Sequence, residues 1–156
     1  MSSLKLLSNK DNKILDFIKV GLRNASNFDW ASAYATKGAF DLVSDDFNDF
    51  LRRGGRSRAI FDLAQGLTDP EFIEELSTIP GDSECKVFVG LNTTSGIFHH
   101  KFYNFYNPES SWMMLGSANF TKAGLTTNME SSISVSSDVD EGIYSEATTF
   151  FDQSIW

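Results

Sequence analysis

Apolar residues along the chain follow two spacings, one typical of helices and one typical of strands. The helical spacing, with apolar side chains three and four residues apart, covers residues 12–24 and 38–53. A Thr68-x-x-Glu71 capping box, with Pro70 in its first turn, predicts a third helix from that point. Short apolar runs typical of buried strands lie between these helices, at residues 28–35, 57–63 and 85–89. This alternation predicts an α/β sheet with helices packed on both faces.

The pattern changes after residue 96. Residues 97–105 and 111–115 alternate as two strands, and residues 107–110 have the composition of the turn that joins them. A loop then leads into a short helix expected to end near Gly124, residues 129–136 alternate as another strand, and residues 138–151 predict a helix capped by Asp138. No repeat or linker divides the sequence, so we expect a single domain over residues 1–156.

The composition supports a packed core. Of the 156 residues, 41% are hydrophobic and 22% are charged, which excludes a disordered chain. No apolar run approaches the roughly 20 residues that span a bilayer, and the N-terminus has no apolar signal segment. The lone Cys85 can form neither an internal disulfide nor a cysteine metal cluster. These features predict a soluble cytoplasmic protein that does not associate with membranes.

The net charge of −8 is unevenly distributed. Ten of the thirteen Lys and Arg lie in residues 1–60, whereas residues 102–156 hold one cation and seven carboxylates. Nucleic-acid binding depends on phosphate neutralisation, so this acidity argues against a protein that coats nucleic acid. An anionic partner would instead be bound by a few lysine or arginine side chains at specific positions. The most compact cationic cluster comprises Arg52, Arg53, Arg56 and Arg58. Such a cluster is most often a solvated helix end. Contact with DNA phosphates is a minority hypothesis.

Two polar residues at the start of a predicted strand have catalytic potential. Side chains two apart on a strand share a face, so His99 and Lys101 place a titratable nucleophile beside a cation. His100 faces the other way and is interpreted as a packed or surface histidine.

Three further residues extend this set. Ser117 and Asn119 lie in a glycine-bearing loop that enters a helix, where hydroxyl, amide and backbone N–H groups can bind phosphate oxygens. Glu130, at the start of the next strand, can hold an imidazole N–H and fix the tautomer of the ring. The ordinary alternatives are helix caps for the first two and a solvent-facing strand residue for the glutamate.

His99-x-Lys101 followed by Gly116-Ser117-x-Asn119 resembles the His-x-Lys and Gly-Ser-x-Asn signature of the phospholipase D superfamily. The wider string, through residues 128–130, is similar to the nuclease-type branch, which includes metal-independent restriction endonucleases and phospholipase D-like domains attached to helicases. Many members carry an aspartate five residues after the lysine, where this chain has a tyrosine. The resemblance therefore implies that the later glutamate, Glu130, takes the orienting role.

The resemblance also implies a mechanism and an assembly. Members with one motif copy build one composite site across the two-fold axis of a homodimer. One His99 attacks phosphorus and forms a phosphohistidine, while His99 of the partner subunit protonates the leaving oxygen. Lys101, Ser117 and Asn119 bind the non-bridging oxygens. No cofactor or metal is implied, and the sequence has no other ligand cluster at metal-binding spacing.

Three functions remain open at this stage. The first is a nuclease acting on DNA or RNA, with further affinity from a DNA-binding domain or a partner subunit. The second is a hydrolase of phospholipids or small phosphodiesters, which an acidic surface tolerates better. The third is a catalytically silent dimerisation or effector module. Aromatic residues outside the motif are interpreted as core or dimer interface rather than base-stacking platforms; they are Trp112, Phe150, Phe151, Trp156 and the pairs at 102–103 and 105–106.

Overall fold

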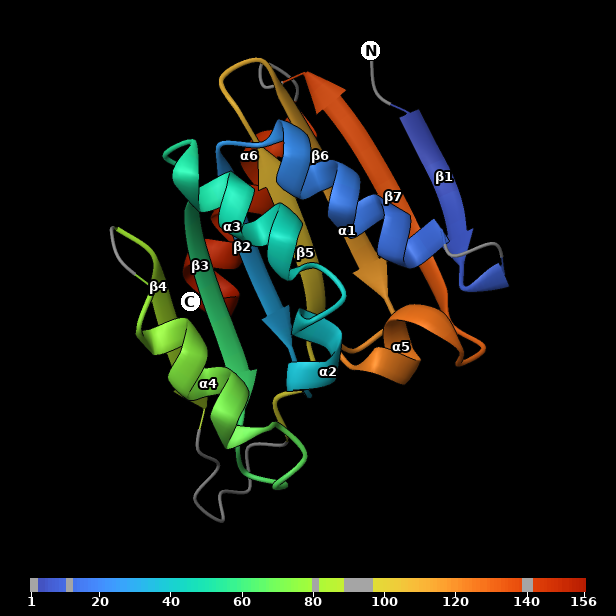
Figure 1. Ribbon diagram of the computed structural model, residues 1–156. Helices are drawn as coiled ribbons and strands as arrows, with labels where there is room; N and C mark the ends of the chain where they lie inside the picture. Colours follow the sequence, from blue (N-terminus) through green and yellow to red (C-terminus); the bar gives the residue numbers. More distant parts are fainter. Residues whose placement is uncertain (1–2, 11–12, 80–81, 89–96, 139–141) are drawn as a thin grey trace.

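The computed structural model describes residues 3–10, 13–79, 82–88, 97–138 and 142–156 (Figure 1). Within these ranges seven strands form one mixed sheet in the order β1-β7-β6-β5-β2-β3-β4. β2, β3 and β4 are parallel, and the other neighbouring pairs are antiparallel. The strands are β1 (Ser3–Ser8), β2 (Asn27–Ser32), β3 (Arg56–Asp62), β4 (Glu84–Phe88), β5 (Lys101–Tyr106), β6 (Ser110–Gly116) and β7 (Ser131–Asp138).

Helices cover both faces of the sheet, as predicted. α6 (Gly142–Phe150) and the π-helical turn that follows it (Phe151–Ile155) lie on one face, and five helices lie on the other (Figure 1). These five are α1 (Lys13–Asn24), α2 (Lys37–Phe40), α3 (Ser44–Arg52), α4 (Pro70–Ser77) and α5 (Lys122–Thr126).

The larger core lies beneath the five helices and is rich in aromatic rings. The rings of Phe28 and Phe105 stack with centroids 3.9 Å apart, and Phe28 also stacks on Trp30. The smaller core beneath α6 includes Ala31, Phe102 and Phe151. The C-terminal aromatic residues contribute to packing here, because Phe151 is buried and its ring stacks on that of Trp156 at 5.8 Å.

Several predicted boundaries are wrong, for local reasons. The sequence does not predict β1, because Leu4 and Leu6 are exposed; the strand pairs with β7, and its Leu7 packs against the larger core. The predicted helix over residues 38–53 is two helices, α2 and α3, separated by residues 41–43. β5 begins at Lys101, after the four irregular residues 97–100.

One predicted helix cap is also wrong. Thr68 does not cap α4, because its hydroxyl donates to the carbonyl oxygen of Asp62 (2.7 Å) and accepts the N–H of Ala35 (3.3 Å). Asp69 occupies the N-cap position instead. Asp138 is the last residue of β7, and the predicted cap of α6 falls next to residues 139–141, which lie outside the described residues.

The ends of four strands meet at one edge of the sheet. Ser32, the last residue of β2, pairs with Lys101 at the start of β5. Gly116, at the end of β6, pairs with Ser132 near the start of β7. Segments distant in sequence are thereby brought together, and this edge contains the candidate site.

Candidate active site

His99 and Lys101 are in direct contact, as their spacing predicts. The Nζ of Lys101 lies 2.7 Å from Nδ1 and 2.9 Å from Nε2 of His99, and 3.1 Å from the histidine's carbonyl oxygen. The imidazole is exposed, whereas Lys101 is only 7% exposed. Burial lowers the pKa of Lys101, and the negative charge of Glu130 acts in the opposite direction. The site therefore presents an accessible ring beside a cation that is largely shielded from water.

His100 faces away from this pair, as predicted. Its ring centroid lies 4.9 Å from that of Phe98 and 6.2 Å from that of Phe150 in α6. Burial, followed by the positive charges of Lys101 and His99, lowers the pKa of His100. This environment is typical of a packed histidine on the α6 face.

Asn119 is oriented by the end of β2. Its Oδ1 accepts the backbone N–H of Tyr34 (3.2 Å) and lies 3.4 Å from the hydroxyl of Ser32. Ser32 is fully buried, donates to the carbonyl of Tyr34 (2.6 Å) and accepts the N–H of Phe120 (2.8 Å). Because the amide oxygen faces these donors, the Nδ2 group of Asn119 is the part that can donate to a phosphate oxygen.

The sequence motif did not include Ser32 or Tyr34. In the sequence they are a hydroxyl and an aromatic residue at the end of a predicted buried strand. That pattern does not indicate that they contact Asn119. Asn119 is not the cap of α5, because Thr121 occupies that position and accepts the N–H of Gly124 (3.0 Å). The amide is therefore not committed to a capping role.

The loop that carries Ser117 and Asn119 is also anchored to β5. The hydroxyl of buried Tyr103 donates to the carbonyl of Ala118 at 2.9 Å. Ala118 lies between Ser117 and Asn119, so this bond ties the loop to the strand that begins at Lys101. Burial raises the pKa of Tyr103, which keeps the phenol protonated as a donor.

Ser117 and Glu130 form a second pair at this edge. The hydroxyl of Ser117 donates to the carboxylate of Glu130 and accepts the backbone N–H of Ser131 (3.1 Å). The other carboxylate oxygen accepts a bond from Asn128 Nδ2 (3.2 Å). Among the described contacts Glu130 thus bonds Ser117 and Asn128 rather than His99, so its role in orienting the imidazole stays a prediction.

Gly116 permits the close approach of β6 and β7 beside this pair. A Cβ atom there would lie 2.2 Å from the Oγ of Ser132 and 2.6 Å from the carbonyl oxygen of Ser131. Any larger residue would push the two strands apart where Ser117 meets Glu130.

The arginine cluster lies away from this edge. Arg56 pairs with Asn27, which is at the opposite end of β2 from Ser32. The structure does not bring the four guanidinium groups to His99, and substrate binding by them stays a prediction. Each has a partner within the chain: Arg52 with Asp49, Arg53 with the carbonyl of Leu22 (2.7 Å), Arg56 with Glu84 (3.0 Å), and Arg58 with Asp29 (2.6 Å) and Asp152 (2.8 Å).

Metal-binding clusters and membrane-spanning helices are both absent from the described ranges. There, no group of three or more His, Cys, Asp or Glu side chains is arranged to hold a metal ion. None of the helices in this part of the chain combines the length and apolar character that a bilayer crossing requires.

Comparison with known proteins identifies the family. Residues 21–156 match the family described as "Cardiolipin synthase, PLD-like domain". The chain belongs to the phospholipase D superfamily. The matched range contains both halves of the motif, from His99 to Asn119. No curated protein matches the chain.

Several solved structures share the fold of this chain. NucT from Helicobacter pylori superposes with a TM-score of 0.75 and 17% identity, covering 98% of this chain and 95% of its own. Nuc from Salmonella typhimurium, a phospholipase D family member, has a TM-score of 0.65 and 17% identity, covering 98% and 96%. Phosphatidylserine synthase from Haemophilus influenzae has a TM-score of 0.70 and 13% identity, covering 97% of this chain and 38% of its own. The predicted phospholipase D-like α/β fold is confirmed.

Proposed function

We propose that the protein is a metal-independent phosphodiesterase that cleaves nucleic acid with His99 as its nucleophile. The observation that carries this proposal is the contact of the Lys101 ammonium with both ring nitrogens of an exposed His99. At the same edge, Asn119 offers an amide to a phosphate, and the hydroxyl of Ser117 would exchange its bond to Glu130 for one to a phosphate oxygen. A lysine supplies the positive charge and these polar groups supply hydrogen bonds to the non-bridging oxygens, so the reaction is proposed to proceed without a metal.

The reaction consists of two displacements at phosphorus. A ring nitrogen of His99 forms a bond to phosphorus, the bond to the leaving oxygen breaks, and a second acid gives that oxygen a proton. Water then attacks the phosphohistidine, gives up a proton to the second group, and releases the imidazole and a phosphomonoester. Lys101 and Asn119 bind the equatorial oxygens in both steps, where charge develops.

A homodimer would supply the second acid, because each chain has one copy of the motif. His99 of the partner subunit would take that role. An exposed apolar sheet face next to the site supports this assembly. Leu6 pairs with Ile133, and Ile133 with Leu115, so the three side chains share one face, on which Leu6 is 77% exposed.

This face adjoins both α6 and the site. Leu115 pairs with Phe102, which belongs to the core under α6, and directly precedes Gly116 of the motif. A two-fold contact that covers the face would bury apolar surface and bring two motif copies close together.

Nucleic acid is the proposed substrate because the motif and its trailing Asn-Met-Glu string resemble the nuclease-type branch. The second candidate is a phospholipid or a small phosphodiester. It is supported by the fold shared with phosphatidylserine synthase, at a TM-score of 0.70.

A size-resolved activity assay tests the proposal. Fractions from gel filtration are assayed with plasmid, single-stranded oligonucleotide and phosphatidylcholine, each with and without EDTA. We expect nuclease activity in the dimer fraction, with no loss in EDTA, and a decrease of at least about 10³-fold in His99→Ala. His100→Ala is the matched control and should keep its activity, because that ring packs on the opposite face. Full activity in His99→Ala, or activity only with added metal, would contradict the mechanism, and turnover of phosphatidylcholine alone would favour the second candidate.

A further inference from the structure

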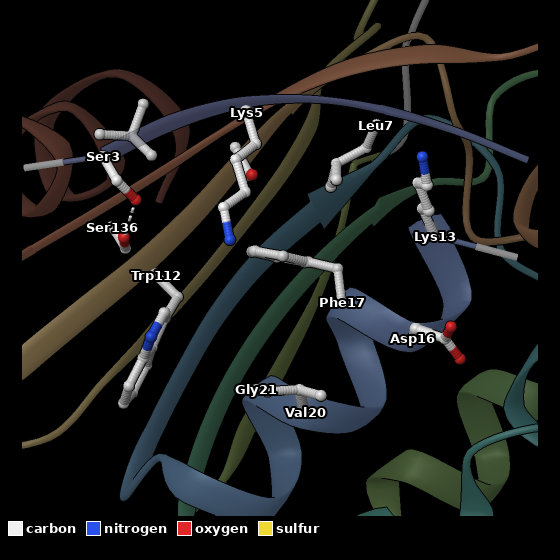
Figure 2. Close-up of a pocket in the computed structure, with 12 residues that line it drawn as sticks. Ser3, Lys5, Leu7, Lys13, Asp16, Phe17, Val20, Gly21, Trp112 and Ser136 are labelled. Atoms are coloured by element: carbon white, nitrogen blue, oxygen red, sulfur yellow. Dashed lines mark hydrogen bonds between the residues drawn. The ribbon is translucent and has the colours of Figure 1, made fainter. Parts of the chain in front are cut away.

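A groove lies between β1 and α1, on the sheet face opposite α6 and away from His99. It encloses about 360 Å³, within the usual range for ligand pockets. Its apolar lining comes from Leu7, Phe17, Val20 and Trp112, and serine hydroxyls of β1 and β7 contribute polar groups (Figure 2). None of the groups assigned to catalysis lines it.

Two aromatic rings flank this groove. Phe17 comes from α1 and Trp112 from β6, and both are half-buried. Phe105 supports both of them: its ring makes an edge contact with Phe17 at 5.9 Å, and it pairs with Trp112 across β5 and β6. Rings that are held in place but still accessible can stack on a planar ligand with little loss of side-chain entropy.

Cations accompany the rings. The amine of Lys5 projects between Phe17 and Trp112, and Lys13 lies at the start of α1 (Figure 2). The carboxylate of Asp16 points away from Lys5 in the same view. A planar aromatic group next to a negative charge fits this combination, and a nucleotide has both.

Lys10 extends the positive charge toward the site. It lines a neighbouring hollow of about 470 Å³, together with Ser8, Met129 and Glu130. In the described part of the chain, Lys5, Lys10 and Lys13 take part in no ion pair, whereas Lys37 pairs with acidic side chains. These three lysines outnumber the two described carboxylates that line the same groove and hollow, Asp16 and Glu130. This side of a chain of net charge −8 is therefore locally positive and favours an anionic ligand.

We infer that the groove and the hollow form one track for a single-stranded segment of nucleic acid that extends from the active site. This inference rests on the proposed function. β1 connects the two, since Ser8 lines the hollow and Ser3 lines the groove, about 17 Å further along the strand. A single strand is favoured over a duplex because a base must leave its stack to lie against Trp112. The lysines hold the phosphates of the same strand.

Binding and small-substrate turnover test the track separately. Binding of a fluorescent 15-nucleotide oligothymidylate is measured by anisotropy on the full chain carrying His99→Ala, at several salt concentrations. Turnover of bis(4-nitrophenyl) phosphate, which is too small to reach the groove, is measured on chains with His99 intact. Each of three changes is made in both backgrounds: Lys5→Gln with Lys13→Gln, Trp112→Leu, and Lys19→Gln as a matched control on α1 outside the groove.

The lysine pair variant should weaken oligonucleotide binding about tenfold and reduce the slope of log affinity against log salt by about 1.4, or 0.7 for each lost phosphate contact. Trp112→Leu should weaken binding at least about fivefold with an unchanged salt slope. Lys19→Gln should leave binding unchanged, and all three should leave turnover of the small substrate unchanged.

Unchanged oligonucleotide binding in both groove variants overturns the track. Equal binding of a 15-base-pair duplex, with the same sensitivity to Trp112→Leu, overturns its assignment to a single strand. Groove variants that weaken binding to anionic lipid vesicles but not to the oligonucleotide would identify a lipid site instead. If the protein without substitutions does not hydrolyse bis(4-nitrophenyl) phosphate, the proposed phosphodiesterase activity is refuted. That result is distinct from the binding outcomes that test the track.

Discussion

Replacement of Ser32 by alanine tests whether the end of β2 positions the candidate catalytic amide. Ser32 is fully buried, and its hydroxyl joins the carbonyl of Tyr34 (2.6 Å) to the N–H of Phe120 (2.8 Å). Alanine removes both bonds and leaves two backbone groups without their side-chain partner. An unsatisfied buried group costs about 1–3 kcal/mol, so we expect a loss of about 2 kcal/mol in the free energy of unfolding. At this chain length, that corresponds to a decrease in Tm of about 4–8 °C.

The effect on activity should exceed the effect on stability. Asn119 Oδ1 accepts the N–H of Tyr34, whose carbonyl is held by Ser32, so the amide should shift when this link is lost. A misplacement near 1 Å can reduce a rate about 100-fold, and we expect kcat to fall about 10- to 100-fold at a temperature where the variant is still folded.

Ser57→Ala is the matched control for this experiment. Ser57 is also buried, and it accepts the indole N–H of Trp30 at 2.9 Å, near the other end of the sheet. It should lose a similar amount of stability in urea titration, with an unchanged kcat. If Ser32→Ala keeps the kcat of Ser57→Ala, the positioning role of Ser32 is refuted.

Three further predictions concern packing, a thiol and the buried lysine. Gly21→Ala should lower the free energy of unfolding by about 1–2 kcal/mol in urea titration, because its Cβ would lie 2.5 Å from the ring of buried Phe105, whereas Gly142→Ala, with open space around it, should be neutral. Burial raises the pKa of Cys85 to about 11, so the rate of iodoacetamide alkylation should increase through pH 11 in the folded protein and near pH 9 in urea; a midpoint near 9 in both would contradict this. Burial lowers the pKa of Lys101 in the folded protein, so the charged ammonium destabilises the fold at pH values below that lowered pKa, and this penalty decreases as the pH rises from it to the pKa of the unfolded chain. Lys101→Met should therefore raise Tm at pH 7, while kcat falls at least about 100-fold. A lower Tm in this variant would refute the reasoning.

The motif residues could be predicted from sequence because their chemistry depends on short spacings. The strand predicted over residues 97–105 places His99 and Lys101 on one side, and the structure confirms their contact. The contact forms even though β5 begins only at Lys101 and His99 lies in the irregular segment before it. The support behind Asn119 could not be predicted, because it comes from Ser32, 87 residues earlier in the chain. Pairing between distant strands creates this proximity, and local periodicity carries no information about it.

The same limit applies to the charges and to β1. Arg58 lies in a basic cluster of the sequence, yet its guanidinium bonds buried Asp29 and a carboxylate 94 residues away, at Asp152. The exposed leucines of β1 give no signal of a buried strand, and their position depends on pairing with β7. The predicted cap of α4 is wrong for a related reason. The hydroxyl of Thr68 bonds the backbone of Asp62 and Ala35 rather than the first turn of the helix.

The structure shows how the charges behind the acidity of the chain are distributed. The cations at residues 52–58 have partners within the chain, whereas three lysines at residues 5–13 have none in the described part. The net charge of −8 therefore limits the overall affinity for the proposed nucleic-acid substrate, and the side of the molecule that carries these three lysines is where the proposed single strand would bind. Binding should be weak and should decrease quickly as salt rises.

Capture of the covalent intermediate tests the central claim most directly. The protein is mixed with an oligonucleotide substrate, quenched within milliseconds in alkaline denaturant, which preserves phosphohistidine, and digested for mass spectrometry. We expect a phosphoramidate bond on His99 that appears before the product and is absent in His99→Ala. Cleavage at the full rate with no adduct, or with the adduct on another residue, would contradict the account.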